Sequence, residues 1–180
     1  MGPIEILYLT IGIIVVLIGL ARGYVKELGS TLIILVALFI LTFFKEPVDA
    51  ALGAAAQGAF GSEEGAEPEL FLSLFYTIVF VAIVFTGYAG RTLTFGGHPA
   101  PPPQGLLLSF LVGIINGYLI AGTLWYYQEA YGYPFFQPFQ SEFTEAAQAM
   151  IAFLPPSLFE DNPVYWIIPV AILLIIRVRG

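Results

Sequence analysis

Long apolar runs, separated by short polar stretches, dominate the pattern along this chain. Four of them have about the 17–25 residues that an α-helix needs to cross roughly 30 Å of hydrocarbon. These runs cover Ile4–Ala21, Leu28–Phe44, Leu70–Ala89 and Gly105–Tyr127. Each is therefore predicted to be a membrane-spanning helix.

A fifth apolar run is shorter and covers Val164–Ile176. Asn162 and Pro163 just before it are typical of a helix start, with Asn162 at the N-cap and Pro163 at the first helical position. Residues 163–179 would form a helix of about 25 Å at 1.5 Å per residue. Arg177 and Arg179 can extend to the membrane surface and cover the shortfall. We expect this helix to span, and an interfacial or re-entrant segment is the alternative.

The polar segments 45–69 and 128–162 are too long for tight turns. Pro47–Phe60 is rich in alanine and is expected to form a short helix on the membrane surface. Ser141–Leu154 begins like a second one, with Ser141 as its N-cap and apolar residues at helical spacing. That helix either packs flat on the bundle or offers a docking face to a partner. The predicted fold is an all-α membrane protein, a single domain over residues 1–180, with about five transmembrane helices and short amphipathic helices on the outside face.

Composition agrees with a membrane environment. The chain is 58% hydrophobic and 11% charged, with a mean hydropathy of +0.88, whereas soluble domains average about 25% charged residues. A chain this apolar cannot bury its large side chains in one water-soluble core of this size, so lipid must be much of its solvent. It has no cysteine, which excludes disulfides, thiolate metal sites and cysteine nucleophiles.

The basic residues are unevenly distributed between the two predicted membrane faces. Lys45 is the only one on the face that carries nearly all the acids. By the positive-inside rule the other face is cytoplasmic, which places the N-terminus outside and the C-terminus inside. The net charge of −7 gives no reason to expect a nucleic-acid partner. The five basic residues of the predicted cytoplasmic face are expected to anchor the chain at the membrane interface: Arg22, Lys26, Arg91, Arg177 and Arg179.

The predicted helix interiors offer little for chemistry. All acidic, basic and histidine side chains sit at the ends of these helices or in loops, and the only strongly polar residue well inside a predicted span is Asn116. We expect Asn116 to make an interhelical hydrogen bond rather than to bind a substrate. The single histidine, His98, lies in a proline-rich loop. The chain shows no catalytic triad, phosphate loop or metal-ligand spacing, so we expect no enzyme activity, cofactor or metal site. A pigment or lipid held by packing alone stays open.

Small residues provide a positive signal for helix packing. Gly19 and Gly23 are four residues apart, as are Gly113 and Gly117. Such spacing lets helix backbones approach closely. The contact could lie inside the bundle or between chains.

Two of these segments resemble the colicin V production (CvpA) family. Gly19–Ser30 (GLARGYVKELGS) looks like that family's first cytoplasmic turn, and Gly113–Leu119 (GIINGYL) resembles its glycine-rich fourth helix. The aromatic segment before Ser141–Leu154 also resembles its outside segment, so that the similarity covers roughly residues 4–154. The resemblance implies a bacterial inner-membrane protein linked to toxin export and envelope maintenance.

These observations lead to one functional hypothesis and two alternatives. The hypothesis is a non-catalytic inner-membrane protein of CvpA type, which acts through helix assembly with itself or with other membrane proteins in the lipid bilayer. The first alternative is an accessory transmembrane subunit of a larger respiratory or photosynthetic complex. The second is an oligomeric channel or transporter.

Overall fold

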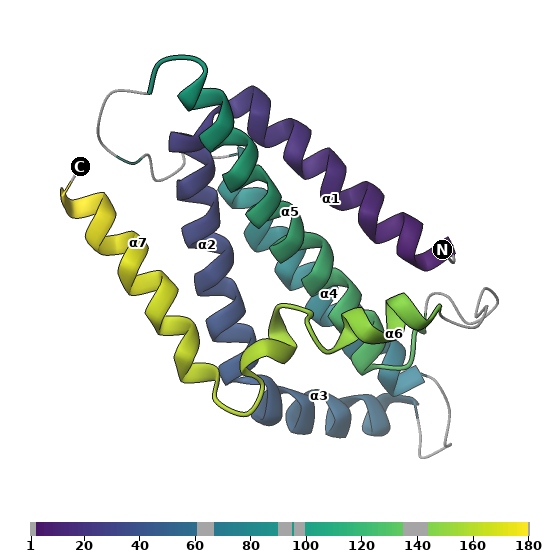
Figure 1. Cartoon of the computed structure of the whole chain (residues 1–180). Helices are drawn as coiled ribbons and strands as arrows, with labels where there is room; N and C mark the ends of the chain where they lie inside the picture. Colours follow the sequence, from purple (N-terminus) through teal and green to yellow (C-terminus); the bar gives the residue numbers. More distant parts are fainter. Residues whose placement is uncertain (1–2, 61–66, 90–94, 96–99, 135–143, 180) are drawn as a thin grey trace.

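The computed structural model describes residues 3–60, 67–89, 95, 100–134 and 144–179, and its regular elements in these ranges are all helices (Figure 1). The all-α prediction is therefore confirmed for the described residues. Two short 3₁₀ helices, η2 and η3, precede the last α-helix. The elements are α1 (Pro3–Arg22), α2 (Tyr24–Phe43), α3 (Lys45–Phe60), α4 (Glu67–Ala89), α5 (Gln104–Ala130), α6 (Glu145–Ile151), η2 (Pro156–Phe159), η3 (Pro163–Trp166) and α7 (Ile167–Arg179).

Helices α1, α2, α4 and α5 are long and apolar enough to cross a membrane. Large apolar side chains project from the bundle instead of entering its core; Leu17, Ile78, Phe85 and Leu106 are each more than half exposed. Lipid is the solvent that tolerates such a surface. These helices are those of a multi-pass membrane protein.

The closest helix pair is α1 with α5, and glycines make it possible. A Cβ atom on Gly19 would lie 3.0 Å from the Cα atom of Gly113, and one on Gly117 would lie 2.7 Å from the carbonyl oxygen of Gly12. The two backbones therefore touch, as small residues allow in membrane helices. The structure thus places Gly19, Gly113 and Gly117 at a contact inside the chain.

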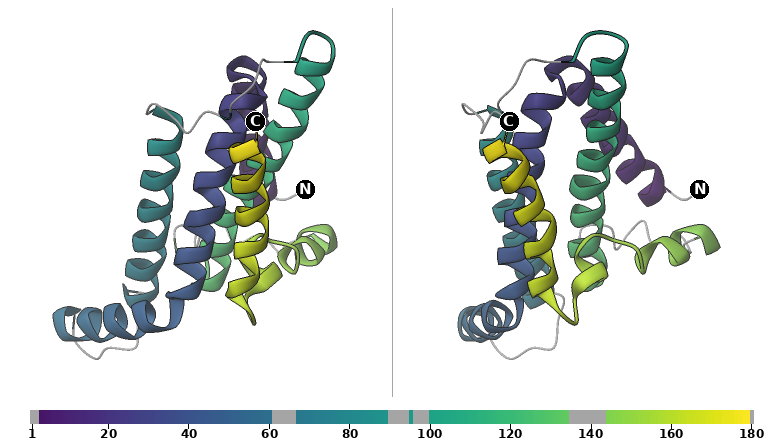
Figure 2. Two further views of the ribbon diagram at one scale, coloured as in Figure 1. Left: turned by 90° about the vertical axis from the view of Figure 1, so that its left-hand side faces the viewer. Right: turned by 60° about the vertical axis from the view of Figure 1, so that its left-hand side comes forward.

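Helices α3 and α6 lie across one end of the bundle, and the turn between α1 and α2 lies at the opposite end (Figures 1 and 2). Asp49 holds α3 in place. Its Oδ1 atom accepts hydrogen bonds from the hydroxyls of Tyr76 and Tyr131, each at 2.8 Å, and its Oδ2 atom lies 3.0 Å from Lys45 Nζ. A helix is therefore present where one was predicted over Pro47–Phe60, and α4 and the end of α5 hold it against the bundle.

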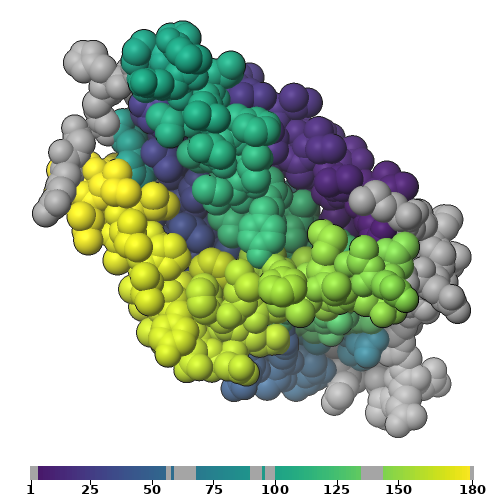
Figure 3. Space-filling view, in the orientation of Figure 1, coloured from purple at the N-terminus to yellow at the C-terminus, as the bar shows by residue number. Residues whose placement is uncertain are grey.

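Helix α6 is shorter than the predicted helix over Ser141–Leu154. Its N-cap is Thr144, whose Oγ1 atom accepts a hydrogen bond from the backbone N–H of Ala147 at 3.2 Å; Ser141 lies outside the described residues. Glu5 of α1 accepts a hydrogen bond from the Thr144 backbone N–H at 3.3 Å and another from its hydroxyl. Figure 3 shows α6 and the segment after it lying across the front of the bundle. Helix α6 is thus packed on the bundle through buried Ala147, while Met150, which borders the groove between α6, α1 and α5, stays exposed.

The fifth predicted span corresponds to η3 and α7. The segment Pro163–Val178 is apolar but shorter than the four long helices. The α-helical part begins only at Ile167, which puts Pro169 in the first turn, where the missing N–H is tolerated. Asn162 occupies the N-cap of η3, but its side chain makes no capping hydrogen bond. The structure contains four helices of spanning length in its described part, and the count of five spans stays a prediction.

Candidate functional site

The turn between α1 and α2 contains a single residue outside the helices, Gly23. Its φ of +85° favours glycine over any residue with a side chain. The Gly23 N–H donates to the carbonyl of Gly19 at 3.0 Å, and the Gly23 carbonyl accepts from the N–H of Glu27 at 3.2 Å. A Cβ atom on Gly23 would meet nothing within 4 Å. Gly19 therefore serves helix packing, whereas Gly23 serves the reversal of the chain.

This tight turn starts α2 at Tyr24, four residues before the predicted run beginning at Leu28. Lys26 and Glu27 are therefore helical residues. Lys26 points outward and is exposed, but the Glu27 side chain is fully buried in the bundle. The expectation that the helix interiors hold no ionisable side chain is wrong for Glu27, because the turn is too short to leave this residue in a loop.

The Glu27 carboxylate joins four helices. Its Oε1 atom lies 2.6 Å from Nη1 of Arg22 at the end of α1. Its Oε2 atom accepts a hydrogen bond from the hydroxyl of Tyr88 on α4 at 2.9 Å and another from Nδ2 of Asn116 on α5 at 2.8 Å. We call Arg22, Glu27, Tyr88 and Asn116 the Glu27 hub. A buried carboxylate is tolerated only when it is paired and hydrogen-bonded in this way.

Arg22 was expected to anchor the chain at the membrane surface. In the structure its guanidinium points toward buried Glu27. Its Nη1 atom also donates to Ser30 Oγ at 3.1 Å, and its guanidinium lies 4.4 Å from the centre of the Tyr88 ring. The Arg22 side chain is 18% exposed, so the ion pair lies at the edge of the bundle with one side near its surface. Arg22 therefore contributes to the interior at least as much as to the interface.

Asn116 of α5 makes hydrogen bonds to residues of α2, as predicted for an interhelical role. Its Nδ2 atom also donates to the backbone carbonyl of Glu27 at 3.2 Å, and its Oδ1 atom accepts from the Thr31 hydroxyl at 2.7 Å. The amide is fully buried, and both its oxygen and its nitrogen are bonded within the protein. The expected hydrogen bond is thus present, and its partner is the carboxylate that the sequence interpretation placed outside the bundle.

The glycine contact between α1 and α5 lies directly beside the hub. A Cβ atom on Gly19 would come within 3.5 Å of Glu27 Cγ as well as close to Gly113. The backbone N–H of Tyr24, at the start of α2, donates to Ser109 Oγ of α5 at 2.9 Å. Small residues therefore bring α5 close enough for its polar side chains to reach α2.

Of the remaining predicted anchors, Lys26 and Arg177 do not join this cluster. Lys26 is exposed at the same end of the molecule, and Arg177 lies half-exposed in the last turn of α7. Arg179 ends α7, and Arg91 lies outside the described residues. The anchoring role of these residues stays a prediction.

Glu27, Tyr88 and Thr31 were missed as site residues, although the sequence holds a signal for two of them. Glu27, Ser30, Thr31 and Ile34 recur at the spacing of one helix face, and all four are buried. This pattern becomes visible once α2 is begun at Tyr24. Tyr88 had no such signal, because its partner lies 61 residues away in the chain.

The hub offers no open position to a ligand atom. Each carboxylate oxygen of Glu27 already has a donor from another helix. Within the described residues there is no group of three or more histidine, cysteine or acidic side chains that could hold a metal ion. The arrangement suits the joining of helices and the burial of one ion pair.

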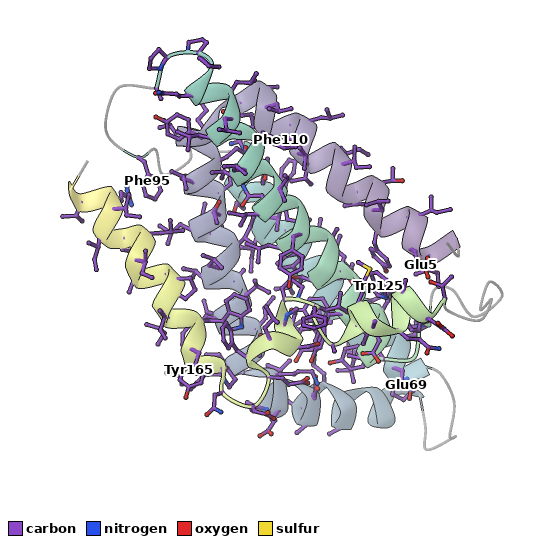
Figure 4. The ribbon with its side chains drawn as sticks, in the orientation of Figure 1. Glu5, Glu69, Phe95, Phe110, Trp125 and Tyr165 are labelled. Carbon is purple, nitrogen blue, oxygen red and sulfur yellow. The ribbon has the colours of Figure 1, made fainter. Side chains whose placement is uncertain are left out.

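An apolar groove of about 350 Å³ lies between α1, α5 and α6, toward the end of the bundle opposite the Glu27 hub (Figure 1). Glu5 and Trp125 lie beside α6 (Figure 4) and both line this groove. The Tyr8 ring stacks on Trp125 with 5.3 Å between ring centres, and Trp125 Nε1 donates to the hydroxyl of Tyr133 at 2.9 Å. These aromatic groups contact one another at the end of the bundle that α3 and α6 cover (Figure 1).

No protein-family model, curated protein or solved structure matches this chain. The Glu27 hub and the two sequence motifs that supply it are therefore the features from which a function can be inferred.

Proposed function

We propose that this chain is a non-catalytic multi-pass protein of a bacterial inner membrane, of CvpA type, linked to toxin export or envelope maintenance. It acts by assembling with other membrane chains. One observation carries the proposal: the two segments on which the resemblance rests, Gly19–Ser30 and Gly113–Leu119, converge in the Glu27 hub. Arg22 and Glu27 come from the first segment and Asn116 from the second. Motifs so distant in the chain that meet in one bonded cluster behave as a single structural unit.

The proposed orientation places the N-terminus outside and the C-terminus in the cytoplasm. The Arg22–Lys26 turn and the C-terminal end of α7 lie at one end of the bundle, opposite α3 and α6 (Figure 1). Basic residues favour the cytoplasmic side, which supports five spans with α7 as the last. Helices α3 and α6 then cap the bundle on the outer surface.

Assembly requires a surface other than the glycine contact between α1 and α5, because that contact is occupied within the chain. Leu107, Leu111 and Ile115 form an exposed apolar stripe along α5, with each residue one helical turn from the next and more than 40% exposed. We propose this stripe as part of the assembly surface. Replacing Gly113 or Gly117 would test folding, and replacing the stripe tests assembly.

The deciding experiment is purification of the full chain from native membranes in mild detergent, followed by identification of the proteins that travel with it. A self-assembled species without cofactor-bearing partners is expected. Leu111→Ala together with Ile115→Ala should weaken that species, and Ile78→Ala on α4 is the matched lipid-facing control. A stoichiometric set of redox or pigment proteins would instead make the chain an accessory subunit of a respiratory or photosynthetic complex, and the proposal would fall.

The buried ion pair favours a second candidate, an oligomeric channel or transporter. Ionisable side chains buried in membrane bundles often mark ion or proton paths, and the Arg22 guanidinium retains some exposure beside buried Glu27. This candidate predicts ion or proton flux in liposomes that hold the purified chain. Glu27→Gln should abolish the flux while the chain still inserts. Liposomes that contain the wild-type oligomer and show no flux would eliminate this candidate.

A further inference from the structure

A second apolar groove, of about 310 Å³, runs between α2, α4 and α7. Helix α7 lies beside α2 with its C-terminal end toward the end of the bundle that holds the α1–α2 turn (Figures 1 and 2). Val36 and Ile40 of α2, Ile83 of α4 and Leu174 of α7 are among the walls of the groove. The single charged side chain that lines it is Arg177, in the last turn of α7.

Arg177 differs from Arg22 and Lys45, the described basic residues that have an acidic partner. Arg22 pairs with Glu27 and Lys45 with Asp49. Among the described residues, Arg177 takes part in no ion pair or hydrogen bond. A guanidinium beside apolar walls is stabilised by an anion that satisfies its donors, and no described acidic side chain supplies one here.

We propose that this groove binds one anionic phospholipid, with an acyl chain between α2 and α7 and the head-group phosphate on Arg177. Guanidinium groups bind phosphate through two parallel hydrogen bonds. Arg177 lies at the end of an apolar helix, which is where lipid head groups meet a bundle that crosses the membrane. The apolar walls match a hydrocarbon chain, and the position of the charge matches the phosphate attached to it. This site goes beyond the proposed function and does not depend on it.

The test uses the purified full chain in mild detergent and native mass spectrometry. Phosphatidylglycerol and phosphatidylcholine with identical acyl chains are the two probes. The wild-type chain should retain one phosphatidylglycerol in preference to phosphatidylcholine. Arg177→Gln should weaken phosphatidylglycerol retention about fivefold, as expected for the loss of one basic contact at an anionic lipid surface. Lys26→Gln is the matched control, because it removes the same charge at the same end from an exposed residue that does not line the groove.

A second pair of variants separates the groove from the charge. Val36→Trp places a large side chain in the groove and should lower the retention of both lipids. Ile78→Trp is its control, since Ile78 faces lipid from α4, is 61% exposed and does not line the groove. Helical content measured by circular dichroism establishes that each variant is folded.

Three results would overturn the proposal. Equal retention of both lipids by the wild-type chain would mean that the charge of the head group does not contribute to binding. Equal losses in Arg177→Gln and Lys26→Gln would reduce the effect to general electrostatic attraction. Displacement of phosphatidylglycerol by inorganic phosphate, with no effect of Val36→Trp, would assign Arg177 to a free anion instead of a lipid.

Discussion

Glu27 presents one carboxylate to donors from three helices other than its own. Arg22 supplies the charge, and Tyr88 and Asn116 supply neutral hydrogen bonds. Because the group is fully buried, each lost donor leaves an acceptor that water cannot reach. The consequences of single substitutions should therefore be large at this position and small at its exposed neighbour Lys26.

Glu27→Gln removes the ion pair and leaves the Arg22 guanidinium without its partner. We expect a loss of about 2–3 kcal/mol in the free energy of unfolding, at or below the usual range for breaking a buried pair because Arg22 is partly exposed. Unfolding followed by circular dichroism in detergent measures it. Lys26→Gln serves as control and should change stability by less than about 0.5 kcal/mol. Equal effects of the two substitutions would show that the hub does not stabilise the fold.

The stability that Tyr133 contributes is expected to depend on pH. Burial raises the pKa of its hydroxyl to about 12, the negative charge of Glu129 adds to this rise, and the hydrogen bond from the Trp125 indole opposes it. The pKa of Tyr131 is raised as well, by burial and then by its hydrogen bond to Asp49. Since the folded state holds both hydroxyls neutral, their contribution to stability is present below pH 10 and is lost as pH rises toward the folded pKa.

We therefore expect Tyr133→Phe to be less stable than the wild-type chain at pH 8, because it loses the bond to Trp125. The difference should narrow between about pH 10 and 12, where the wild-type hydroxyl ionises. Thermal unfolding across this pH range provides the measurement. A stability difference that widens in alkali would contradict the assigned direction of the pKa shift.

At the scale of elements, the α1–α5 pair depends on contact between backbones. Gly12 and Gly19 of α1 face Gly117 and Gly113 of α5. The hub and this contact support each other, because a shift of α5 away from α1 would also move Asn116 away from Glu27. Disruption of either one should loosen both.

Gly117→Ala should destabilise the protein by about 1–3 kcal/mol, since the added Cβ would lie 2.7 Å from a backbone oxygen of α1. Gly53→Ala on α3 is the matched control. A Cβ atom there meets nothing within 4 Å, so the substitution should be neutral or stabilise the helix by up to about 1 kcal/mol. Urea or thermal unfolding of the two variants distinguishes helix contact from helix propensity. Tolerance of Gly117→Ala would mean that the two helices can separate without cost.

The whole molecule has a basic end and an end capped by α3 and α6, and this polarity determines its proposed orientation. Helices α1, α2, α4 and α5 carry the chain back and forth between these ends, and α7 runs from the capped end toward the basic end (Figure 1). If α7 crosses the bilayer, its last turn shares a side with the α1–α2 turn.

Single cysteines can test this arrangement, because the natural chain has none. Gly53→Cys on α3 should react with a membrane-impermeant maleimide added to intact cells. Lys26→Cys should react only after the membrane is permeabilised, and so should Val178→Cys if α7 spans. Labelling of Val178→Cys from outside would show that α7 does not cross the membrane and that the protein has four spans. Labelling of Lys26→Cys from outside would reverse the orientation.

Hydrophobic length alone predicted the existence and approximate position of helices α1, α2, α4 and α5, because a segment that must satisfy its backbone in lipid has to be helical. It did not predict that α2 begins at Tyr24. The sequence also identified Asn116 as interhelical and Gly19, Gly113 and Gly117 as sites of close packing, but it was wrong for Gly23, which forms the turn instead. The partner of each could not be derived, because contacts between helices join residues that are far apart in sequence. Glu27 shows the difference most clearly. By composition it belongs to a polar turn, but one glycine with positive φ makes that turn so short that the carboxylate enters the bundle. Only the tertiary structure decides that Arg22, Tyr88 and Asn116 meet it there, since burial of a charge depends on which partners the fold brings within hydrogen-bonding distance.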